Sequence, residues 1–417
     1  MLSELLPSKL KKICIITPGI LASNPRVVKE AEALSEAGYQ VHLIYTRHVN
    51  YLISDDEEIL REHPEWTFDY LDWAGPDYPS RKLKFLSGIK KKVSTWTIRA
   101  GMYPGRSAGI LLNRFYSWQL KKAIAQKADL YIAHYPDSIA VAAQAAKTNK
   151  SHFAFDAEDY HRGEDLPKWL IKIITLVENR LLPKARFISA ASPLIALEYQ
   201  KHYSETKVFT LENTFPTKRQ PAFLKLPAEP FKFFWFSQTI GQKRGLEQFI
   251  SILGKCKRTD LQLTLLGNCN NSYRDILIKL WTSKNLNPEL LTILPTVPEK
   301  QIFLLASRHH FGLGLEIQYS KNRNICLTNK IFTYILSGNF LILSETEAQQ
   351  KFNSEYPGTG TMVDLYDPKK AAKVLLELLG DPELEQKRSQ NYHLGKNSLN
   401  FDRQKSILLS HVTQVWN

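Results

Sequence analysis

A run of ionisable side chains lies between Phe155 and Asp165, in the sequence FDAEDYHRGED. The run follows a predicted strand, and open α/β sheets bind their ligands at the carboxyl ends of their strands. Crowded carboxylates raise one another's pKa and accept hydrogen bonds from sugar hydroxyls. An acidic cap on a helix beginning near Asp165 explains the end of the run but leaves its beginning unexplained. Because His134 ends the preceding predicted strand, we predict one catalytic group: His134, Asp156, Glu158, Asp159 and His161.

Two further segments pair a cation with the predicted start of a helix. In FFWFSQTIGQKRGLEQFI, Lys243 and Arg244 precede a helix that opens near Gly245. In TNKIFTYILSG, Asn329 or the residue before it caps a helix that carries Lys330. The free N–H groups of a helix N-terminus attract anions, and an adjacent cation strengthens the attraction. Two such sites, each after a predicted strand, predict that the C-terminal half binds a nucleoside diphosphate.

The segment ICIITPGILASNPRVVKEAEALSEAGY forms another strand–turn–helix pattern near the N-terminus. Asn24 is placed to cap the helix, and Pro25 suits the first helical position because its missing N–H needs no partner there. Arg26 then places a cation in the first turn, where the helix dipole disfavours it. Either Arg26 only solvates the surface, or it contacts an anion or an acceptor. We favour the second interpretation and predict an acceptor site at Gly19, Asn24 and Arg26.

Short β-branched or aromatic runs alternate with amphipathic helical patterns along the chain, which predicts parallel sheets in an α/β fold. The predicted strands are Ile13–Thr17, Val41–Tyr45, Asp129–Ala133, Phe153–Asp156, Arg186–Ala190, Val208–Leu211, Phe233–Ser237, Leu261–Leu266, Leu291–Leu294, Gly312–Leu315 and Phe340–Leu343. Four prolines interrupt the pattern between Phe215 and Phe231. We therefore predict two Rossmann-like, doubly wound domains, at 1–214 and 232–395, joined by a linker at 215–231.

The end of the chain, 396–417, is predicted to form a helix at Asp402–Val415 after an irregular stretch at 391–400. This helix is free to pack against either half, and packing back on the N-terminal domain is the expectation that we carry forward.

The net charge of +14 is unevenly distributed, because residues 78–128 contain no Asp or Glu. Lysines and arginines in this stretch are interleaved with large apolar residues, a mixture that suits an anionic membrane surface. A solvated helix face with a core helix beside it explains the stretch equally well. No helix-turn-helix, RNP or zinc-finger pattern accompanies it, so nucleic acid is not expected as a partner.

Other features favour a cytoplasmic location, at the inner face of the membrane if the basic stretch docks there. The apolar run after Lys11 and Lys12 is too short for a signal peptide, and no stretch approaches the roughly 18 apolar residues that span a bilayer. The four cysteines form no CxxC pair and have no nearby His at metal-ligand spacing. We expect free thiols and no metal.

These segments, in this order, resemble the family 4 glycosyltransferases, and in particular bacterial members in which a WFSQTIG–RGLE segment precedes an NKxFxYxxxG segment. The matching segments are NPRVVKEAEALSEAGY, DAEDYH, LENTFP, WFSQTIG, RGLE, LLGN and TNKIFTYILSG, spread over nearly the whole chain. The resemblance implies a GT-B fold, in which two Rossmann-like domains face each other across a cleft. It implies transfer of a hexosyl group from a nucleotide sugar on the C-terminal domain to a glycan or lipid-linked acceptor on the N-terminal domain. It further implies retention at the anomeric carbon, no metal or other cofactor, and a place in cell-surface polysaccharide synthesis.

Carried over to this sequence, the motifs of the family assign the donor site. Arg244 stands where the family usually has a lysine, and Asn329 and Lys330 flank the phosphates and the ribose. The loop at 295–297 faces the base through backbone groups. The donor set that the resemblance implies is Ser237, Gln238, Lys243, Arg244, Gly245, Gly267, Thr296, Val297, Glu316, Asn329, Lys330 and Thr333.

The sequence departs from the family pattern at three positions. Thr239 stands where an arginine is usual, and Ile325 and Thr333 stand where two glutamates eight positions apart are usual. Glu316 is placed to take over a ribose or sugar contact. The missing glutamates leave the donor open and keep two alternatives: a nucleotide-sugar epimerase of the same fold, and an inactive partner subunit that binds a glycan or a nucleotide.

Overall fold

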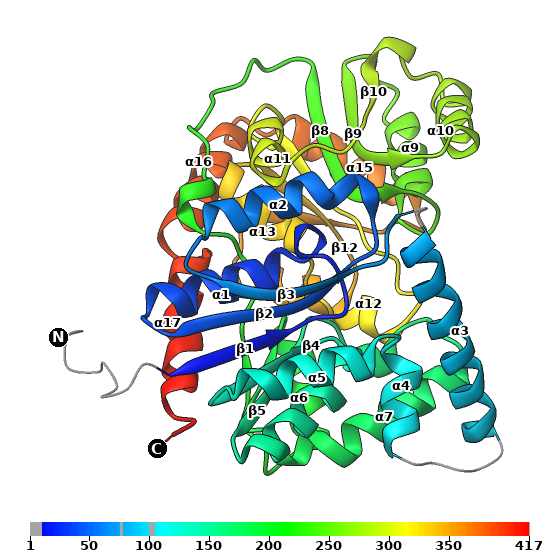
Figure 1. The fold of residues 1–417 in the computed structure, drawn as a ribbon. Coiled ribbons are helices and arrows are strands. Elements are labelled where there is room, and N and C mark those ends of the chain that lie inside the picture. Colours follow the sequence, from blue (N-terminus) through cyan, green and yellow to red (C-terminus); the bar gives the residue numbers. More distant parts are fainter. Residues whose placement is uncertain (1–10, 76–77, 100–104, 417) are drawn as a thin grey trace. The chain divides into compact units, whose positions relative to one another are not determined.

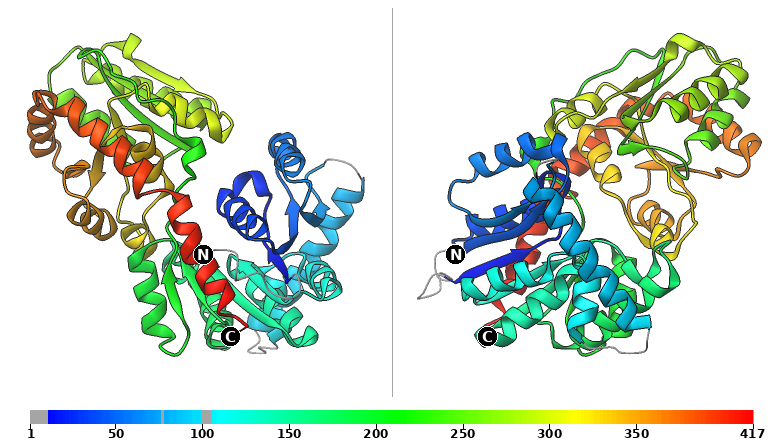
Figure 2. Two further views of the ribbon diagram at one scale, coloured as in Figure 1. Left: turned by 90° about the vertical axis from the view of Figure 1, so that its left-hand side faces the viewer. Right: turned by 45° about the vertical axis from the view of Figure 1, so that its right-hand side comes forward.

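The computed structural model describes residues 11–75, 78–99 and 105–416, so residues 100–104 of the predicted basic stretch lie outside the described residues. The chain divides into two compact units, Met1–Leu211 with Lys405–Asn417, and Glu212–Gln404. Each unit is an α/β domain with one parallel sheet and helices packed on it (Figures 1 and 2). Among the described residues, no helix is both long and apolar enough to cross a membrane.

The first unit contains a seven-stranded parallel sheet in the order β3-β2-β1-β4-β5-β6-β7. Its strands are β1 (Lys12–Ile16), β2 (Gln40–Arg47), β3 (Thr67–Asp72), β4 (Leu130–His134), β5 (His152–Ala157), β6 (Ile188–Ala190) and β7 (Val208–Thr210). The sequence predicts six of them and misses β3. That strand lies at the edge of the sheet and is largely exposed, so it lacks the apolar run that marks a central parallel strand.

Helices cover this sheet and its edges. They are α1 (Pro25–Glu36), α2 (Ile53–Glu62), α3 (Tyr78–Arg99), α4 (Gly105–Leu112), α5 (Tyr116–Gln126), α6 (Pro136–Asn149), α7 (Lys168–Leu181) and α8 (Pro193–His202). Short 3₁₀ turns connect several of them, at Leu21–Ser23, Asn50–Leu52, His161–Gly163 and Leu182–Lys184.

The second unit contains a six-stranded parallel sheet in the order β10-β9-β8-β11-β12-β13. Its strands are β8 (Phe231–Ile240), β9 (Leu261–Cys269), β10 (Leu291–Leu294), β11 (Phe311–Gly314), β12 (Phe340–Ser344) and β13 (Gly360–Val363). Its helices are α9 (Leu246–Lys255), α10 (Asn271–Ser283), α11 (Glu299–Ala306), α12 (Lys321–Ile325), α13 (Asn329–Ser337), α14 (Glu347–Glu355), α15 (Pro368–Leu379) and α16 (Leu384–Asn397), with 3₁₀ turns at Thr217–Arg219 and Pro288–Leu290. The sequence misses only β13, a four-residue strand at the sheet edge.

The prediction of an irregular stretch at 391–400 is wrong, because α16 continues to Asn397. The helix is polar and contains Gly395, which weakens the sequence signal. The glycine has a packing role: a Cβ at Gly395 would lie 2.9 Å from the Cα of Leu336 in α13. Gly395 therefore allows the two helix backbones to approach each other.

The last helix, α17 (Phe401–Thr413), contains the second crossing between the units, at 404/405. The first crossing lies at 211/212, and the segment 215–231, predicted as a linker, belongs to the second unit. Gln220 fixes this segment by donating to the carbonyls of Leu336 and Tyr392. Within the first unit, the segment 405–416 packs beside β7, where His411 stacks on Phe209 with ring centroids 3.8 Å apart.

The strand β8 shows how sequence alternation builds the core of the second unit. Phe233 and Trp235 contribute to the apolar cluster on one face of the sheet, and Phe234 and Phe236 contribute to the cluster on the other. Successive side chains of a strand point to opposite faces, so a run of aromatic residues fills both. The central strand therefore needs helices on both sides.

Both sheets contain a topological switch point, where the strand order changes direction. In the first sheet the chain moves outward from β1 through β2 and β3 and then returns to place β4 on the other side of β1. In the second it moves outward from β8 and returns to place β11 beside it. The crevice at the carboxyl ends of such neighbouring strands is where open α/β sheets bind ligands. The strand order therefore places the candidate ligand sites at the residues that follow β1, β4, β8 and β11.

Replacing Gly312 in β11 by alanine tests the tight packing next to the second switch point. The added Cβ would lie 2.1 Å from Cγ of Tyr334, whose side chain is fully buried and has no room to move. We expect the Gly312→Ala variant to lose about 1–3 kcal/mol of unfolding free energy in urea titrations. Gly380→Ala is the control, because its Cβ would meet nothing closer than 3.6 Å. Equal stability of the two variants would contradict this account.

Candidate functional site

A cavity of about 460 Å³ lies at the switch point of the first sheet. Its wall includes Gly19 and Asn24 from the turn after β1, and Tyr135 from the end of β4. Trp73 and Arg114 contribute an aromatic ring and a cation, with the guanidinium 4.9 Å from the ring centroid. Two residues predicted for the acceptor, Gly19 and Asn24, therefore do line a cavity, and it lies where the fold places ligands.

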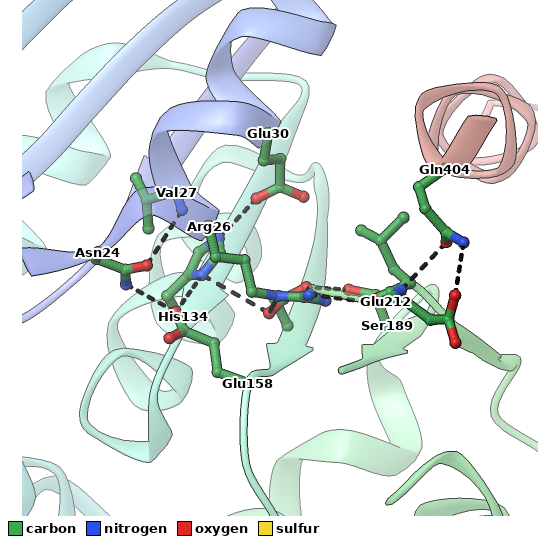
Figure 3. A network of polar contacts seen from close by, with 11 residues as sticks. Asn24, Arg26, Val27, Glu30, His134, Glu158, Ser189, Glu212 and Gln404 are labelled. Carbon is green, nitrogen blue, oxygen red and sulfur yellow. Dashed lines mark hydrogen bonds and ion pairs between the residues drawn. The ribbon is translucent and has the colours of Figure 1, made fainter. Parts of the chain in front are cut away.

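Asn24 connects the start of α1 to the acidic run of the sequence. Its side-chain oxygen accepts from the backbone N–H of Val27 at 3.2 Å, which caps the helix as expected. Its amide nitrogen donates to Glu158 at 2.7 Å (Figure 3). One side chain thus fixes the helix start and a carboxylate that lies 134 residues away in the chain.

Arg26 is buried, and its immediate partner is a carboxylate of the protein. Its Nε and Nη2 donate to the two oxygens of Asp156 at 2.6 and 2.8 Å. Its Nη1 donates to the carbonyl of Leu211 at 2.7 Å. The structure therefore corrects the expectation that Arg26 meets an external anion. Asp156 offsets the unfavourable dipole, and both charges are almost fully removed from water.

His134 is fully buried between two carboxylates. Its Nε2 lies 2.6 Å from Oε2 of Glu30, and its Nδ1 lies 2.8 Å from Oε1 of Glu158 (Figure 3). Asp156 faces the same ring at 3.8 Å. A ring that contacts carboxylates through both nitrogens is an imidazolium that donates twice. It has no nitrogen left for a substrate, so the structure makes His134 a positioning residue for Glu158.

The charges of this network explain the protonation of His134. Burial disfavours the imidazolium, but Glu30, Glu158 and Asp156 outweigh burial and raise the pKa of His134 to about 10. Burial also raises the pKa of Glu30 against the pull of His134, so the two groups compete for one proton. We place that proton on His134, because three carboxylates face only one other cation, Arg26. Burial would raise the pKa of Asp156 too, but Arg26 and His134 lower it.

In the first unit, Tyr135 is a candidate site residue that sequence reasoning missed. It lies on the wall of the main cavity and on that of a second cavity of about 260 Å³. Its backbone has φ 63° and ψ 152°, a strained conformation for an aromatic residue, and such strain is concentrated at functional sites. The Glu158 carboxylate, which is hydrogen-bonded to the hydroxyl, raises the pKa of Tyr135 well above its usual value, and burial adds to this effect. Pro136 after it favours an extended ψ at Tyr135, but it gives no sequence signal for the positive φ.

His161 lies beside Tyr135, with ring centroids 5.7 Å apart, and the charge of Asp159 acts on both side chains. His161 lines the second cavity, and its Nδ1 lies 2.7 Å from Glu164. Burial opposes charging of this ring, but Glu164 and Asp159 raise its pKa to about 9. Its Nε2 is buried and has no hydrogen-bond partner among the described residues. The charged ring therefore holds one N–H that a bound ligand can use, which keeps His161 a candidate for substrate contact.

His134, Asp156 and Glu158 each offer one atom within reach of a common metal ion. In this structure Arg26 and Ser189 already occupy the oxygens of Asp156, and both ring nitrogens of His134 face carboxylates. A divalent ion would have to displace these protons and partners. The arrangement is therefore that of an internal ion network, and a reaction without a metal stays our prediction.

In the second unit, the loop after β8 carries the first half of the predicted donor site. Gly245 has φ 80° and precedes α9, whose N-terminus has no side-chain cap. Lys243 also has positive φ, and its ammonium lies 5.2 Å from the ring centroid of Tyr319. Arg244 between them is half-buried. A Cβ at Gly245 would lie 3.2 Å from Cβ of Leu315, so this loop lies directly beside the end of β11.

The residue after Leu315 is Glu316, which contacts the residues of the second half of the predicted donor site. Its buried carboxylate lies 3.2 Å from Nζ of Lys330 and 3.5 Å from Nη1 of Arg323. Lys330 also lies 5.7 Å from the ring centroid of Trp235 in β8. The structure therefore brings Glu316 and Lys330 together at the second switch point. It adds Arg323, which the sequence prediction did not include.

Thr328, which the sequence offered with Asn329 as a possible helix cap, was not included in the predicted donor set. It is the N-cap of α13, yet its side chain makes no capping bond, and its buried hydroxyl has no partner among the described residues. Asn329 beside it is half-buried, and the hydroxyl of Thr333 donates back to the Asn329 carbonyl at 3.1 Å. Thr333 and Ile325 are both buried, so neither of the two positions of the usual glutamates presents a polar group to solvent.

The remaining predicted donor residues surround the same sheet edge. Gly267 has φ 152°, and a Cβ there would lie 2.3 Å from the carbonyl oxygen of Ser237. Close approach to the irregular end of β8 is thus a sufficient reason for this glycine. Gln238 is exposed at that irregularity, and the half-buried Val297 and exposed Thr296 follow β10. Nothing in their contacts assigns these three residues to a ligand.

The charge on His134 can be tested through the pH dependence of stability. Its pKa in the folded chain, about 10, lies above its ordinary value of 6.5, so its stabilising effect is complete below pH 6.5 and disappears as pH rises through 10. We expect His134→Gln to be destabilised on the order of 3 kcal/mol at pH 6 and much less at pH 10. Urea unfolding at both pH values measures the difference. His393→Gln, at an exposed histidine of α16, is the control, and a pH-independent loss in His134→Gln would show that the ring is neutral.

Comparison with known proteins is informative at the level of structure. No known protein family matches the sequence, and no curated protein sequence is similar to it. Sucrose-phosphate synthase from Thermosynechococcus elongatus superposes with a TM-score of 0.71 at 14% identity, covering 97% of this chain and 99% of that one. Anabaena Alr3699/HepE in complex with UDP and glucose gives 0.68 at 11% identity, covering 97% and 100%. Staphylococcus aureus TarM, in a complex that contains UDP, gives 0.67 at 11% identity, covering 98% and 100%.

A weaker match is a putative UDP-N-acetylglucosamine 2-epimerase from Listeria monocytogenes, with a TM-score of 0.60 at 10% identity, covering 98% of this chain and 97% of that one. At these identities the likeness concerns the fold. The chain has the two-domain α/β fold of GT-B glycosyltransferases, as the sequence resemblance implied.

Proposed function

We propose that this chain is a glycosyltransferase that moves a hexosyl group from a nucleoside-diphosphate sugar to a glycan or lipid-linked acceptor. The proposed transfer retains the anomeric configuration, needs no metal and serves cell-surface polysaccharide synthesis. The observation that carries the proposal is the group at the second switch point, where cations and two uncapped helix N-termini follow β8 and β11.

The proposed donor site is built to bind the negative charge of a nucleoside diphosphate. The N-termini of α9 and α13 offer backbone N–H groups that no capping side chain occupies. Arg244 and Lys330 lie beside these N-termini. Glu316 holds Lys330 by an ion pair and also contacts Arg323. A leaving nucleoside diphosphate gains negative charge as the glycosidic bond breaks, and preorganised donors and cations stabilise that charge. The chain's own groups can therefore do the work that a metal ion does in other transferases.

The acceptor half depends on the cavity of the first unit. Tyr135 and Asn24 present polar groups on its wall, and both are held by Glu158. Trp73, stacked on His48 at 5.7 Å, adds an aromatic surface of the kind that packs on a sugar ring. The role that we assign to this network is positioning of acceptor hydroxyls. A retaining transfer does not require the protein to supply a nucleophile, and Asp156 and His134 are too enclosed to act as one.

The names of the structural neighbours support a nucleotide-sugar donor. Anabaena Alr3699/HepE is described in complexes with UDP and with UDP-glucose, and S. aureus TarM in a complex with UDP. UDP-sugars are accordingly the first donors to test.

The test incubates the purified chain with UDP-, GDP- and dTDP-sugars, with and without oligosaccharide or lipid-linked acceptors. We expect one donor class to raise the melting temperature and to be consumed only when acceptor is present, with unchanged rate in EDTA. An epimerised sugar without acceptor would identify an epimerase instead, in line with the weaker match. Binding without turnover would identify a binding subunit, and no stabilisation by any nucleotide at millimolar concentration would overturn the proposal.

Lys330 gives a sharper test of the donor site. We expect Lys330→Gln to weaken UDP binding at least about tenfold in calorimetric titration, because a charge-assisted contact to phosphate is lost. The control Lys279→Gln removes an exposed lysine of α10 and should bind normally. Since Lys330→Gln also leaves Glu316 buried beside Arg323 alone, the double variant with Glu316→Gln restores charge balance. If that double variant folds and binds UDP like the unaltered chain, Lys330 is no phosphate ligand.

A further inference from the structure

Helix α3 in the first unit buries its small polar residues and exposes its large apolar ones. Ser80, Ser87 and Ser94 are almost fully buried on its inner side. Phe85 and Trp96 are 69% and 67% exposed, and Leu86, Ile89 and Val93 are exposed as well. A helix on a globular protein in water shows the opposite pattern, with the apolar stripe towards the core. The outer face of α3 is therefore not explained by folding in water.

The exposed apolar side chains form one continuous face. At about 100° per residue, Phe85, Leu86, Ile89, Val93 and Trp96 fall within an arc of roughly 100°, and the buried serines occupy the opposite side. We call these five residues the outer face of α3. The helix lies at the periphery of the first unit, next to α4 (Figure 1).

Positive charge flanks the outer face. Arg81 and Lys92 fall on one side of the apolar arc and Lys90 on the other, and all three are exposed. Residues 78–128, which include α3, contain no Asp or Glu that would neutralise these three cations. An apolar strip bordered by cations and free of carboxylates is the pattern of a helix that lies in the interface of an anionic bilayer.

The inner side holds the helix in a fixed orientation. Nε of Arg114 donates to Oγ of Ser87 at 2.6 Å, and its Nη2 donates to the carbonyl of Lys84 at 2.7 Å. Arg114 also lines the cavity of about 460 Å³ at the first switch point, which is the candidate acceptor cavity. It lines a smaller, mostly apolar hollow of about 170 Å³ beneath Leu83 and Leu86 as well. The Arg114 guanidinium therefore connects α3 to the candidate acceptor cavity.

We infer that the outer face of α3 docks on an anionic lipid bilayer, with its apolar side chains in the interface and its flanking cations at the lipid head groups. The helix lies on the surface and does not cross it. If the proposed transferase function holds, docking brings the acceptor cavity to the lipid surface and selects a lipid-linked acceptor over a free glycan. The docking itself does not depend on that function and can be measured without turnover.

The experiment is co-sedimentation of the full chain with vesicles of phosphatidylcholine alone and of phosphatidylcholine containing about one third phosphatidylglycerol. We expect binding to the mixed vesicles only, and weaker binding at high salt. Phe85→Ser combined with Trp96→Ser should reduce partitioning at least about tenfold, because two anchors are lost. Lys90→Gln combined with Lys92→Gln should reduce it by roughly tenfold or more.

Matched controls distinguish docking through α3 from nonspecific hydrophobic adsorption and from nonspecific electrostatic attraction. Tyr51→Ser with Trp169→Ser removes two exposed aromatic residues outside α3, and Lys147→Gln with Lys255→Gln removes two exposed lysines elsewhere. Both controls should sediment like the unaltered chain, and circular dichroism confirms that every variant is folded. Absence of binding to anionic vesicles, or equal binding by the Phe85/Trp96 variant, would overturn the inference. So would sedimentation velocity showing that this face pairs two copies of the chain.

Discussion

The buried ion pair between Arg26 and Asp156 is the constraint on which the first unit depends. The two residues lie 130 positions apart, on the first turn of α1 and at the end of β5, and each is unfavourable in its position without the other. An unpaired buried charge costs several kcal/mol, so the pair holds the start of α1 against the end of β5. Next to the pair, His134 is hydrogen-bonded to Glu30 and Glu158. Glu158 in turn contacts Asn24 and Tyr135, which line the cavity. The rigid interior of this network supports the few groups that a ligand can reach.

The second unit also contains a buried charge that is paired at its switch point. At its switch point Glu316 is the buried anion, and Lys330 and Arg323 surround it from α13 and α12. In the family that the sequence resembles, two glutamates serve this region, and here Ile325 and Thr333 fill their positions and are packed away from solvent. In this chain the buried carboxylate at the sheet edge comes from Glu316, directly after β11. Two cations face Glu316, an arrangement that suits an anionic ligand, and this is the physical basis of the donor site proposed above.

The sequence allowed much of the fold to be predicted, because its central strands are apolar or aromatic runs and its helices begin at recognisable caps such as Asn24 and end at glycines such as Gly338. The two edge strands, β3 and β13, were missed because exposure removes the apolar run. For the sites, the shared edge of parallel strands was enough to bring His134, Asp156 and Glu158 together. The partner of Arg26 could not be predicted, since a contact across 130 residues depends on tertiary register. Tyr135 was missed because backbone strain leaves almost no mark in a single sequence.

Helix α3 shows how a conflict between sequence and packing becomes informative. Burying one Phe or Trp side chain contributes roughly 1.5–3 kcal/mol, whereas burying a serine contributes little and requires a hydrogen bond. A half-turn rotation of α3 would exchange Phe85 and Trp96 for Ser87 and Ser94 at the inner side, yet the bond from Arg114 to Ser87 holds the helix the other way. Stability in water alone does not explain that choice. A surface that removes the apolar face from water and meets the flanking lysines with negative charge does explain it, and an anionic bilayer has both properties.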